Sequence, residues 1–386
     1  MLDLWIERSG SHPLSFSLMY VSDQSDIDRL VDTLVPHAWR WKNVLVAFPL
    51  DVRQAFELGT RRLETLTVES IHCLRDSYQG REPQEPLEIS LAHQLTEMSI
   101  NVQLELNFGT SVLNSVKKLS FYDPEAPVGF NYVLYCLDHY PAVEKLTLKV
   151  SCNDLGIDTK IRTFPSLRSL DVSSFTGYPH QFFDLLCLPQ LHTLTCHWQN
   201  GSYHVFDNFY ADAIAQFLQR SQAPLRNLSL TGDRIDEIHL MKIFRHTPLL
   251  KGFICDYGGD ITVDVVSWAL TLTPSSQLCL ELENITWLTF GQEPNYSQLR
   301  EMICSRWNIQ QSGEGTESGL RAKRHLKMVN IEDPRLTGLL QEPAIQLCVE
   351  RGLNIHFLPK PGQIRDYWQE LDGGDPYPRQ RTFTNG

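Results

Sequence analysis

A short hydrophobic pattern recurs along the chain: one apolar residue, two variable residues, a second apolar residue, one variable residue and a third apolar residue. Its middle position returns about every 26 residues on average, within the roughly 20 to 29 residues of a leucine-rich repeat. The pattern therefore predicts a repeat protein built from similar short units. Its copies are Trp41/Val44/Val46, Leu63/Leu66/Val68, Leu95/Met98/Ile100, Val116/Leu119/Phe121, Val143/Leu146/Leu148, Leu167/Leu170/Val172, Leu191/Leu194/Cys196, Leu225/Leu228/Leu230 and Leu250/Phe253/Cys255.

The alternation inside each copy indicates a short strand. In one copy, the side chains of Leu170 and Val172 face one way and that of Asp171 faces the other. A strand this short cannot bury its apolar side alone, so neighbouring copies must stack into one parallel sheet. Helical spacing of apolar residues between the strands completes the prediction of an α/β leucine-rich-repeat-like solenoid, with a curved parallel sheet and helices on its convex side. The predicted helices cover residues 129–140, 211–220, 236–246 and 262–272.

The pattern weakens outside residues 41–257, although further strands are predicted at Leu278/Leu280/Leu282, Leu326/Val329/Ile331 and Leu353/Ile355/Phe357. A polar, glycine-rich stretch without an apolar anchor predicts a mobile loop at residues 310–320. The predicted organisation is an N-terminal cap (1–40), a regular array (41–257), degenerate repeats with a C-terminal cap (258–371) and a disordered tail (372–386).

The formal net charge of the 386 residues is −12 at pH 7, which opposes general binding to the phosphate backbone of nucleic acids. A compact basic run at residues 321–327 keeps nucleic-acid binding open as an alternative. The nine cysteines are scattered without Cys-x-x-Cys spacing, which indicates reduced thiols. No basic and apolar leader opens the sequence, and no run of about 18 uncharged apolar residues follows. We therefore expect a cytoplasmic or nuclear location and no membrane partner.

Catalytic and metal-binding motifs are missing from the sequence. Nucleotide-binding glycine motifs, the serine-hydrolase elbow and the zinc-protease helix do not occur, so we expect no enzyme activity, no cofactor and no bound metal. His192, Cys196 and His197 have the right chemistry for metal ligands, but strand alternation sends Cys196 inward and His197 outward. Glu281 and Glu283 would lie on one strand face, and such paired carboxylates keep a hydrolase open as an alternative.

Two segments near the start of the chain have a distinctive arrangement. Residues 4–18 are followed by a Pro-His-x-x-Arg-Trp motif at residues 36–41, and degenerate repeats such as residues 92–98 and 164–170 come next. This arrangement resembles the region that follows the F-box in a large family of basidiomycete fungal F-box proteins. The resemblance implies a repeat region that holds the substrate of a cullin-RING ubiquitin ligase. The chain begins where the F-box of such relatives ends, so we expect it to bind the ligase adaptor only if an F-box exists upstream.

The outward side chains of the predicted strands would form the contact surface of such a solenoid. Tyr122 is the expected hot spot, since aromatic residues dominate interface energetics and the neighbouring lysines would attract an acidic partner. The alternative is that these positions are ordinary solvated polar residues. The predicted partner-binding residues are Lys118, Tyr122, Lys145, Thr147, Lys149, Ser169, Asp171, Thr193, Thr195, His197, Asn227 and Ser229.

The sequence thus predicts a non-catalytic protein–protein interaction module with a protein target. A stand-alone repeat scaffold outside the ubiquitin system is the alternative, and a nucleic-acid binder or a hydrolase is a weaker one.

Overall fold

The computed structural model describes residues 2–18, 24–48, 55–56, 59–70, 86–101, 106–109, 111–127, 130–152, 160–177, 180–198, 209–231, 235–256, 263–287, 296–307, 326–331 and 334–357. The chain forms two compact units, Met1–Leu250 and Lys251–Gly386, and each is described by itself. The division at residues 257 and 258 that repeat regularity predicts stays a prediction. The predicted loop at 310–320 and the predicted tail at 372–386 lie outside the described residues.

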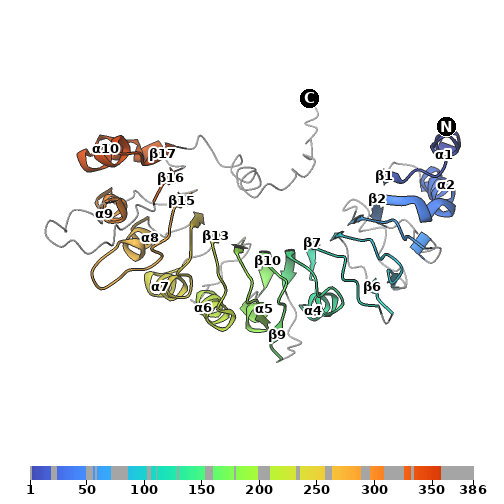
Figure 1. Ribbon diagram of the computed structural model, residues 1–386, viewed down its shortest axis with the longest axis horizontal. Coiled ribbons are helices and arrows are strands. Elements are labelled where there is room, and N and C mark those ends of the chain that lie inside the picture. Colours follow the sequence, from blue (N-terminus) through green and yellow to red (C-terminus); the bar gives the residue numbers. More distant parts are fainter. Residues whose placement is uncertain are drawn as a thin grey trace, which may run out of the picture. The chain divides into compact units, whose positions relative to one another are not determined.

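The first unit contains a curved parallel sheet with helices on its convex side (Figure 1). Consecutive strands of the sheet are hydrogen-bonded neighbours, in the order β1-β2-β3-β5-β7-β8-β10-β12-β13. This is the α/β leucine-rich-repeat-like fold that the hydrophobic pattern predicts. The strands are β1 (Leu14–Leu18), β2 (Trp41–Phe48), β3 (Thr65–Ser70), β5 (Glu97–Asn101), β7 (Lys118–Pro127), β8 (Lys145–Cys152), β10 (Ser169–Gly177), β12 (Thr193–Trp198) and β13 (Asn227–Thr231), and two short pairs join β4 (Leu87–Glu88) to β6 (Leu106–Asn107) and β9 (Arg162–Thr163) to β11 (Leu186–Cys187).

The apolar triplets form the core, as the pattern predicts. Leu146, Leu170 and Leu194 are direct cross-strand partners on β8, β10 and β12, and every residue of the predicted triplets is buried. Successive repeats therefore stack leucine on leucine through the interior of the sheet. Burial of one such side chain contributes about 1.5 to 3 kcal/mol relative to its exposure, so the stability of the unit is spread over the whole stack.

A repeated main-chain arrangement joins each strand to the next. The carbonyl of the residue before a strand accepts two N–H groups from the following repeat: that of Glu144 accepts from Arg168 at 2.8 Å and from Ser169 at 2.9 Å. The side chains at this position also form ion pairs between repeats, such as Lys117 with Glu144 at 3.1 Å. The two variable residues of the triplet thus supply the donors that hold neighbouring repeats in register.

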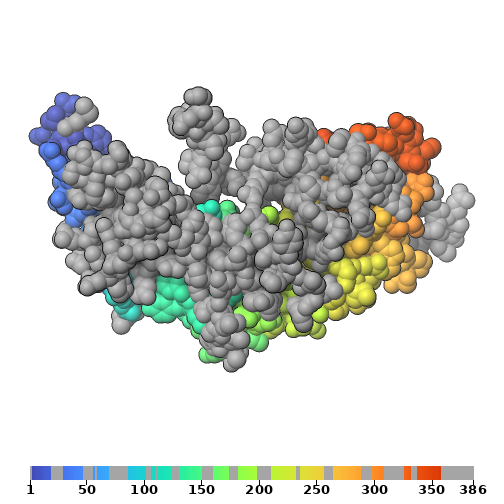
Figure 2. All heavy atoms as spheres, turned by 180° about the vertical axis from the view of Figure 1, so that it is seen from behind, coloured from blue at the N-terminus to red at the C-terminus, as the bar shows by residue number. Residues whose placement is uncertain are grey.

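The helical layer of the first unit packs through aromatic side chains and main-chain anchors. Phe130 stacks on Phe182, with ring centroids 4.9 Å apart. Arg220 donates to the carbonyls of Phe183 and Leu186, at 2.7 and 3.0 Å, and so fixes the end of one helix to the next. Along this unit the repeats follow one another in sequence order, as the successive colours show (Figure 2). The helices are α4 (Phe130–His139), α5 (His180–Asp184), α6 (Phe209–Ser221) and α7 (Glu237–Arg245). The helices predicted at 129–140, 211–220 and 236–246 are confirmed.

The N-terminal segment caps the apolar stack. Arg40 is almost fully buried and donates to the carbonyl of His12 at 2.9 Å and to the hydroxyl of Ser9 at 2.5 Å. Trp41 is buried with its ring edge-on to Phe16, at 5.2 Å between centroids. The Arg-Trp pair of the sequence motif therefore ties the first helix and strand to the repeat array. The helices of this cap are α1 (Leu2–Ser9), α2 (Gln24–Leu34) and the 3-10 helix η1 (Val35–Arg40).

The second unit repeats the strand and helix design with a weaker sequence signal. Its strands, in neighbouring order, are β14 (Gly252–Asp256), β15 (Asn284–Trp287), β16 (Met328–Ile331) and β17 (Asn354–Phe357), all parallel. Its helices are α8 (Val263–Leu270), α9 (Tyr296–Trp307), η3 (Pro334–Gln341) and α10 (Pro343–Glu350). The strands predicted around Val329 and Ile355 and the helix predicted at 262–272 are confirmed.

The strand predicted at Leu278/Leu280/Leu282 is wrong. Residues 278–283 lie outside any strand, Cys279 has a positive φ of 49°, and Leu280 is exposed. The strand is β15, because Leu282, Ile285 and Trp287 are the buried triplet of this repeat. A leucine at every second position imitates a strand, whereas the spacing of the triplet identifies the real one.

Candidate partner-binding face

The predicted contact residues lie in rows that cross neighbouring strands of the first unit. Strict register from β7 to β13 places equivalent outward positions side by side, at the roughly 4.8 Å spacing of paired strands. The first row is Lys118, Lys145, Ser169, Thr193 and Asn227; the middle row is Ser120, Thr147, Asp171, Thr195 and Ser229; and the last row is Tyr122, Lys149, Ser173, His197 and Thr231. These three rows are called the polar face below.

The polar face lies on the side of the sheet opposite the helices, because its residues alternate with the buried triplets. Lys118 and Lys145 are exposed, and the middle row is half-buried throughout. Within the described residues, the face changes in character along the sheet. Lysines stand on β7 and β8, the carboxylate of Asp171 lies on β10, and hydroxyl, amide and imidazole groups follow on β12 and β13.

The structure confirms only part of the contact between Tyr122 and the lysines. Lys149 Nζ lies 5.8 Å from the centre of the Tyr122 ring, which is a cation–π contact. Lys118 is the first residue of β7, four residues before Tyr122, and forms an ion pair with Glu97 at 2.7 Å. Lys145 occupies the first row beside Lys118. The positive charge near Tyr122 therefore comes first from Lys149, and the charge of Lys118 is partly balanced.

The far end of the last row is an internal hydrogen-bonding cluster. His197 Nδ1 is hydrogen-bonded to the hydroxyl of Thr231, which also donates to the carbonyl of Cys196 at 3.3 Å. Ser173 and Thr231 also stand at outward positions of their strands, but they are only 8% and 7% exposed. These contacts hold β12 to β13 and restrict the imidazole of His197. The alternation in the sequence predicts on which side of the sheet a side chain lies, but it does not predict how exposed that side chain is.

The structure separates the residues that could have formed a metal site. Cys196 is completely buried on the core side, and burial, with a smaller effect of the Asp171 carboxylate, raises the pKa of its thiol well above the ordinary value. His192 Nδ1 is 2.6 Å from the carbonyl of Gln190. Within the described part of the chain, no group of three or more histidine, cysteine or acidic side chains is placed to hold a metal ion.

The paired-carboxylate hypothesis is not supported by position, because Glu281 and Glu283 precede β15 and do not share a strand. Glu283 binds Lys327 at 2.7 Å and Lys251 at 3.6 Å. The hydrogen bond from Lys327 is the main cause that lowers the pKa of Glu283, and the positive charges of both lysines act in the same direction. Lys327 of the basic run is thus engaged in an ion pair, and residues 321–325 lie outside the described residues.

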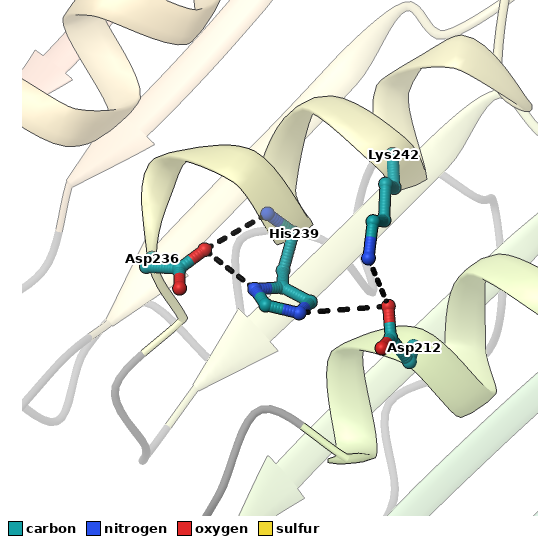
Figure 3. A network of polar contacts seen from close by, with 4 residues as sticks. All are labelled: Asp212, Asp236, His239 and Lys242. Atoms are coloured by element: carbon teal, nitrogen blue, oxygen red, sulfur yellow. Dashed lines mark hydrogen bonds and ion pairs between the residues drawn. The ribbon is translucent and has the colours of Figure 1, made fainter.

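A polar network on the helical side of the first unit was not predicted from sequence (Figure 3). Asp236 caps α7 by accepting from the backbone N–H of His239 at 2.9 Å and from its Nδ1 at 2.5 Å. His239 Nε2 lies 3.5 Å from a carboxylate oxygen of Asp212 on α6, which also accepts from Lys242 at 2.7 Å. The network joins two neighbouring helices. In the sequence, the network is indicated only by the Asp-x-x-His spacing at the start of a helix.

Comparison with solved structures finds several chains that are similar to this one. A solved structure of a protein from Bacteroides fragilis, a target of the Northeast Structural Genomics Consortium, is similar to this chain at 13% sequence identity. The match covers 90% of this chain and 87% of that chain, with a TM-score of 0.38. No protein-family model and no curated protein matches the chain. Among the described residues, no helix combines the length and the apolar character needed to cross a bilayer.

Proposed function

We propose that the polar face of the first unit binds a protein partner and that the chain acts by binding, without catalysis. The observation that carries this proposal is the register of the face, because outward side chains from β7 to β13 form continuous rows. The inward side chains of the same strands belong to the buried triplets. Repeat proteins use extended surfaces of this kind for recognition.

The side chains on this face favour an acidic and extended partner segment. Lys145 and Lys149 lie two rows apart on β8, and Tyr122 contributes an aromatic surface beside Lys149. The hydroxyl groups of Thr147, Thr195 and Ser229 can each donate and accept hydrogen bonds. A partner crossing the strands would meet positive charge on β7 and β8 and neutral polar groups on β12 and β13.

The resemblance of residues 4–18 and 36–41 to fungal F-box proteins supports a narrower form of the proposal. In that form the bound protein is a substrate of a cullin-RING ubiquitin ligase. Because adaptor binding requires an F-box, the same resemblance makes this role conditional on an F-box encoded upstream. A stand-alone scaffold is the alternative, and capture of adaptor and cullin subunits with the chain extended by its upstream coding sequence distinguishes the two.

The test is quantitative affinity capture with the full chain and with the variant Tyr122→Ala/Lys145→Glu/Lys149→Glu. We expect the variant to lose at least about tenfold in partner recovery, because removing an aromatic anchor costs about 2 kcal/mol or more and charge reversal slows association. The matched control is Arg245→Glu, which reverses an exposed charge on α7. Equal recovery with the variant and the unchanged chain would reject the polar face as the binding site.

A further inference from the structure

A second row of side chains, mostly charged, runs along the starts of the strands in the first unit. Main-chain hydrogen bonds fix this row, because the backbone N–H of each member donates to the carbonyl of the member before it at 2.8 Å. From β2 to β13 one residue of each repeat therefore stands beside its equivalent in the next repeat. In chain order the members are Lys42, Glu64, Thr96, Lys117, Glu144, Arg168, His192 and Arg226.

Opposite charges balance one another in the first part of this row. Lys42 lies 3.4 Å from Glu64, and Lys117 lies 3.1 Å from Glu144. Each lysine meets a carboxylate of the neighbouring repeat, so this part of the row presents little net charge to a partner.

The last three members, Arg168, His192 and Arg226, are called the basic row below. Arg168 and Arg226 are exposed, and within the described residues neither guanidinium forms a hydrogen bond or an ion pair. Between them, His192 has its Nδ1 2.6 Å from the carbonyl of Gln190, which leaves Nε2 as the remaining polar atom of the ring. Lys145, the first residue of β8, is also exposed and adds a positive charge beside the basic row.

The basic row concentrates positive charge on a chain whose formal net charge is −12. Of the carboxylates on the neighbouring strands, Glu144 is already bound by Lys117, and Asp171 lies in the middle row of the polar face. Arg168 and Arg226 stand two strand spacings apart, about 10 Å. Two guanidinium groups at this separation can each bind a different acidic side chain of a segment that crosses the strands, since guanidinium groups pair with carboxylates through two parallel hydrogen bonds.

We propose that the basic row binds an acidic peptide segment of the protein partner, with carboxylates on Arg168 and Arg226. This inference rests on the proposed function, because the basic row runs beside the first row of the polar face and extends the same interface. A row of separate cations favours a segment with several carboxylates over a single anionic group. Nucleic acid is disfavoured, because the negative charge of the chain as a whole opposes a phosphate backbone.

The test measures binding of a fluorescently labelled decaglutamate peptide to the full chain by anisotropy at low salt. We expect Arg168→Gln/Arg226→Gln to weaken binding at least about tenfold, because two charge-assisted contacts are lost. Arg168→Lys/Arg226→Lys keeps the charges but not the bidentate geometry, so its affinity should be intermediate. High salt should weaken binding to the unchanged chain, since the exposed charges are screened.

Lys42→Gln/Arg245→Gln is the matched control, because it removes two positive charges as well, one already paired with Glu64 and one on α7. The affinity of this control should change less than about twofold. The proposal is overturned if the unchanged chain does not bind the peptide, or if the Arg168→Gln/Arg226→Gln variant binds it no more weakly than the control does. Tighter binding of a single-stranded oligonucleotide of equal charge would overturn it as well.

The variants of the basic row leave Tyr122 and Lys149 unchanged, so this proposal and the proposed function can fail separately. Partner capture that is lost in the polar-face variant but unchanged in Arg168→Gln/Arg226→Gln would reject the basic row and keep the polar face as the binding site. The reverse result would support the basic row and reject the polar face.

Discussion

The middle outward row differs between the two units although the strand design is the same. In the first unit Thr147, Asp171, Thr195 and Ser229 are half-buried and face away from the helices. In the second unit the equivalent positions include Thr286 and Asn330, which are 1% and 5% exposed. Asn330 donates to the Thr286 hydroxyl at 3.1 Å. The same register therefore leaves a half-buried polar row in one unit and forms a buried, hydrogen-bonded pair in the other.

The two units agree, in contrast, in how an arginine fixes the helical layer. Arg220 is the last residue but one of α6, and Arg306 is the last but one of α9. Arg306 is 3% exposed and donates to the carbonyls of Leu270, Leu278 and Cys279, at 2.7 to 2.9 Å. Arg220 is half-buried and serves two carbonyls. Both units therefore use an arginine near a helix end to hold the helical layer, whereas the burial of their middle outward rows differs.

The largest expected effect is a difference in stability between leucine variants of Arg306 and Arg220. Arg306→Leu leaves three buried carbonyls without their donor, so we expect a loss of about 3 kcal/mol in the local free energy of unfolding. Arg220→Leu should cost about 1 to 2 kcal/mol, because it breaks two bonds at a partly solvated site. Hydrogen exchange of the α9 and α6 amides, followed by mass spectrometry, measures both losses. Arg306→Lys should fall between the unchanged chain and Arg306→Leu, and equal losses for the two leucine variants would contradict this ranking.

A smaller effect tests the difference in the middle row directly. Asn330→Ala removes the donor to the buried Thr286 hydroxyl, and we expect a loss of about 1 to 2 kcal/mol. Ser229→Ala, at the equivalent position of the first unit, should change stability by less than about 0.5 kcal/mol. Urea denaturation measures both values. A double-mutant cycle of Asn330→Ala with Thr286→Val should show coupling of about 1 kcal/mol, and additive effects would mean that the bond does not stabilise the unit.

The smallest effect concerns the ion pairs that link repeats. Glu283→Gln weakens contacts to two lysines, so we expect a loss of about 0.5 to 1 kcal/mol at pH 7. Because the folded-state pKa of Glu283 is lowered, its stabilising contribution is present above the ordinary glutamate pKa of about 4.3 and is lost as the pH falls below that value. Denaturation curves of the two proteins should therefore converge near pH 3.

The first unit offers a matched comparison for that effect. Glu64 has the more exposed ion pair, with Lys42 at 3.4 Å. Glu64→Gln should therefore change stability less than Glu283→Gln at pH 7. A difference for Glu283→Gln that persists unchanged at low pH would exclude the ion pairs as its source.

Local periodicity was sufficient to predict the strands of the regular array, their buried triplets and the side of the sheet on which the alternating polar residues lie. The position of Leu170 between Leu146 and Leu194 follows from spacing, because only in-register stacking buries all three. The same rule would have found β15 from Leu282, Ile285 and Trp287, but a nearby alternation of leucines imitates a strand. Spacing that repeats is a local property, and the sequence carries it directly.

Contacts between distant residues were decided only by the tertiary structure. The buried hydrogen bond from Asn330 to Thr286 and the bond from His197 to Thr231 each join residues from different repeats. Insertions of variable length between the repeats leave no fixed spacing from which such pairs can be found. The alternation along a strand assigns a side chain to one face of the sheet, whereas its burial and its partner depend on what the rest of the chain places beside it.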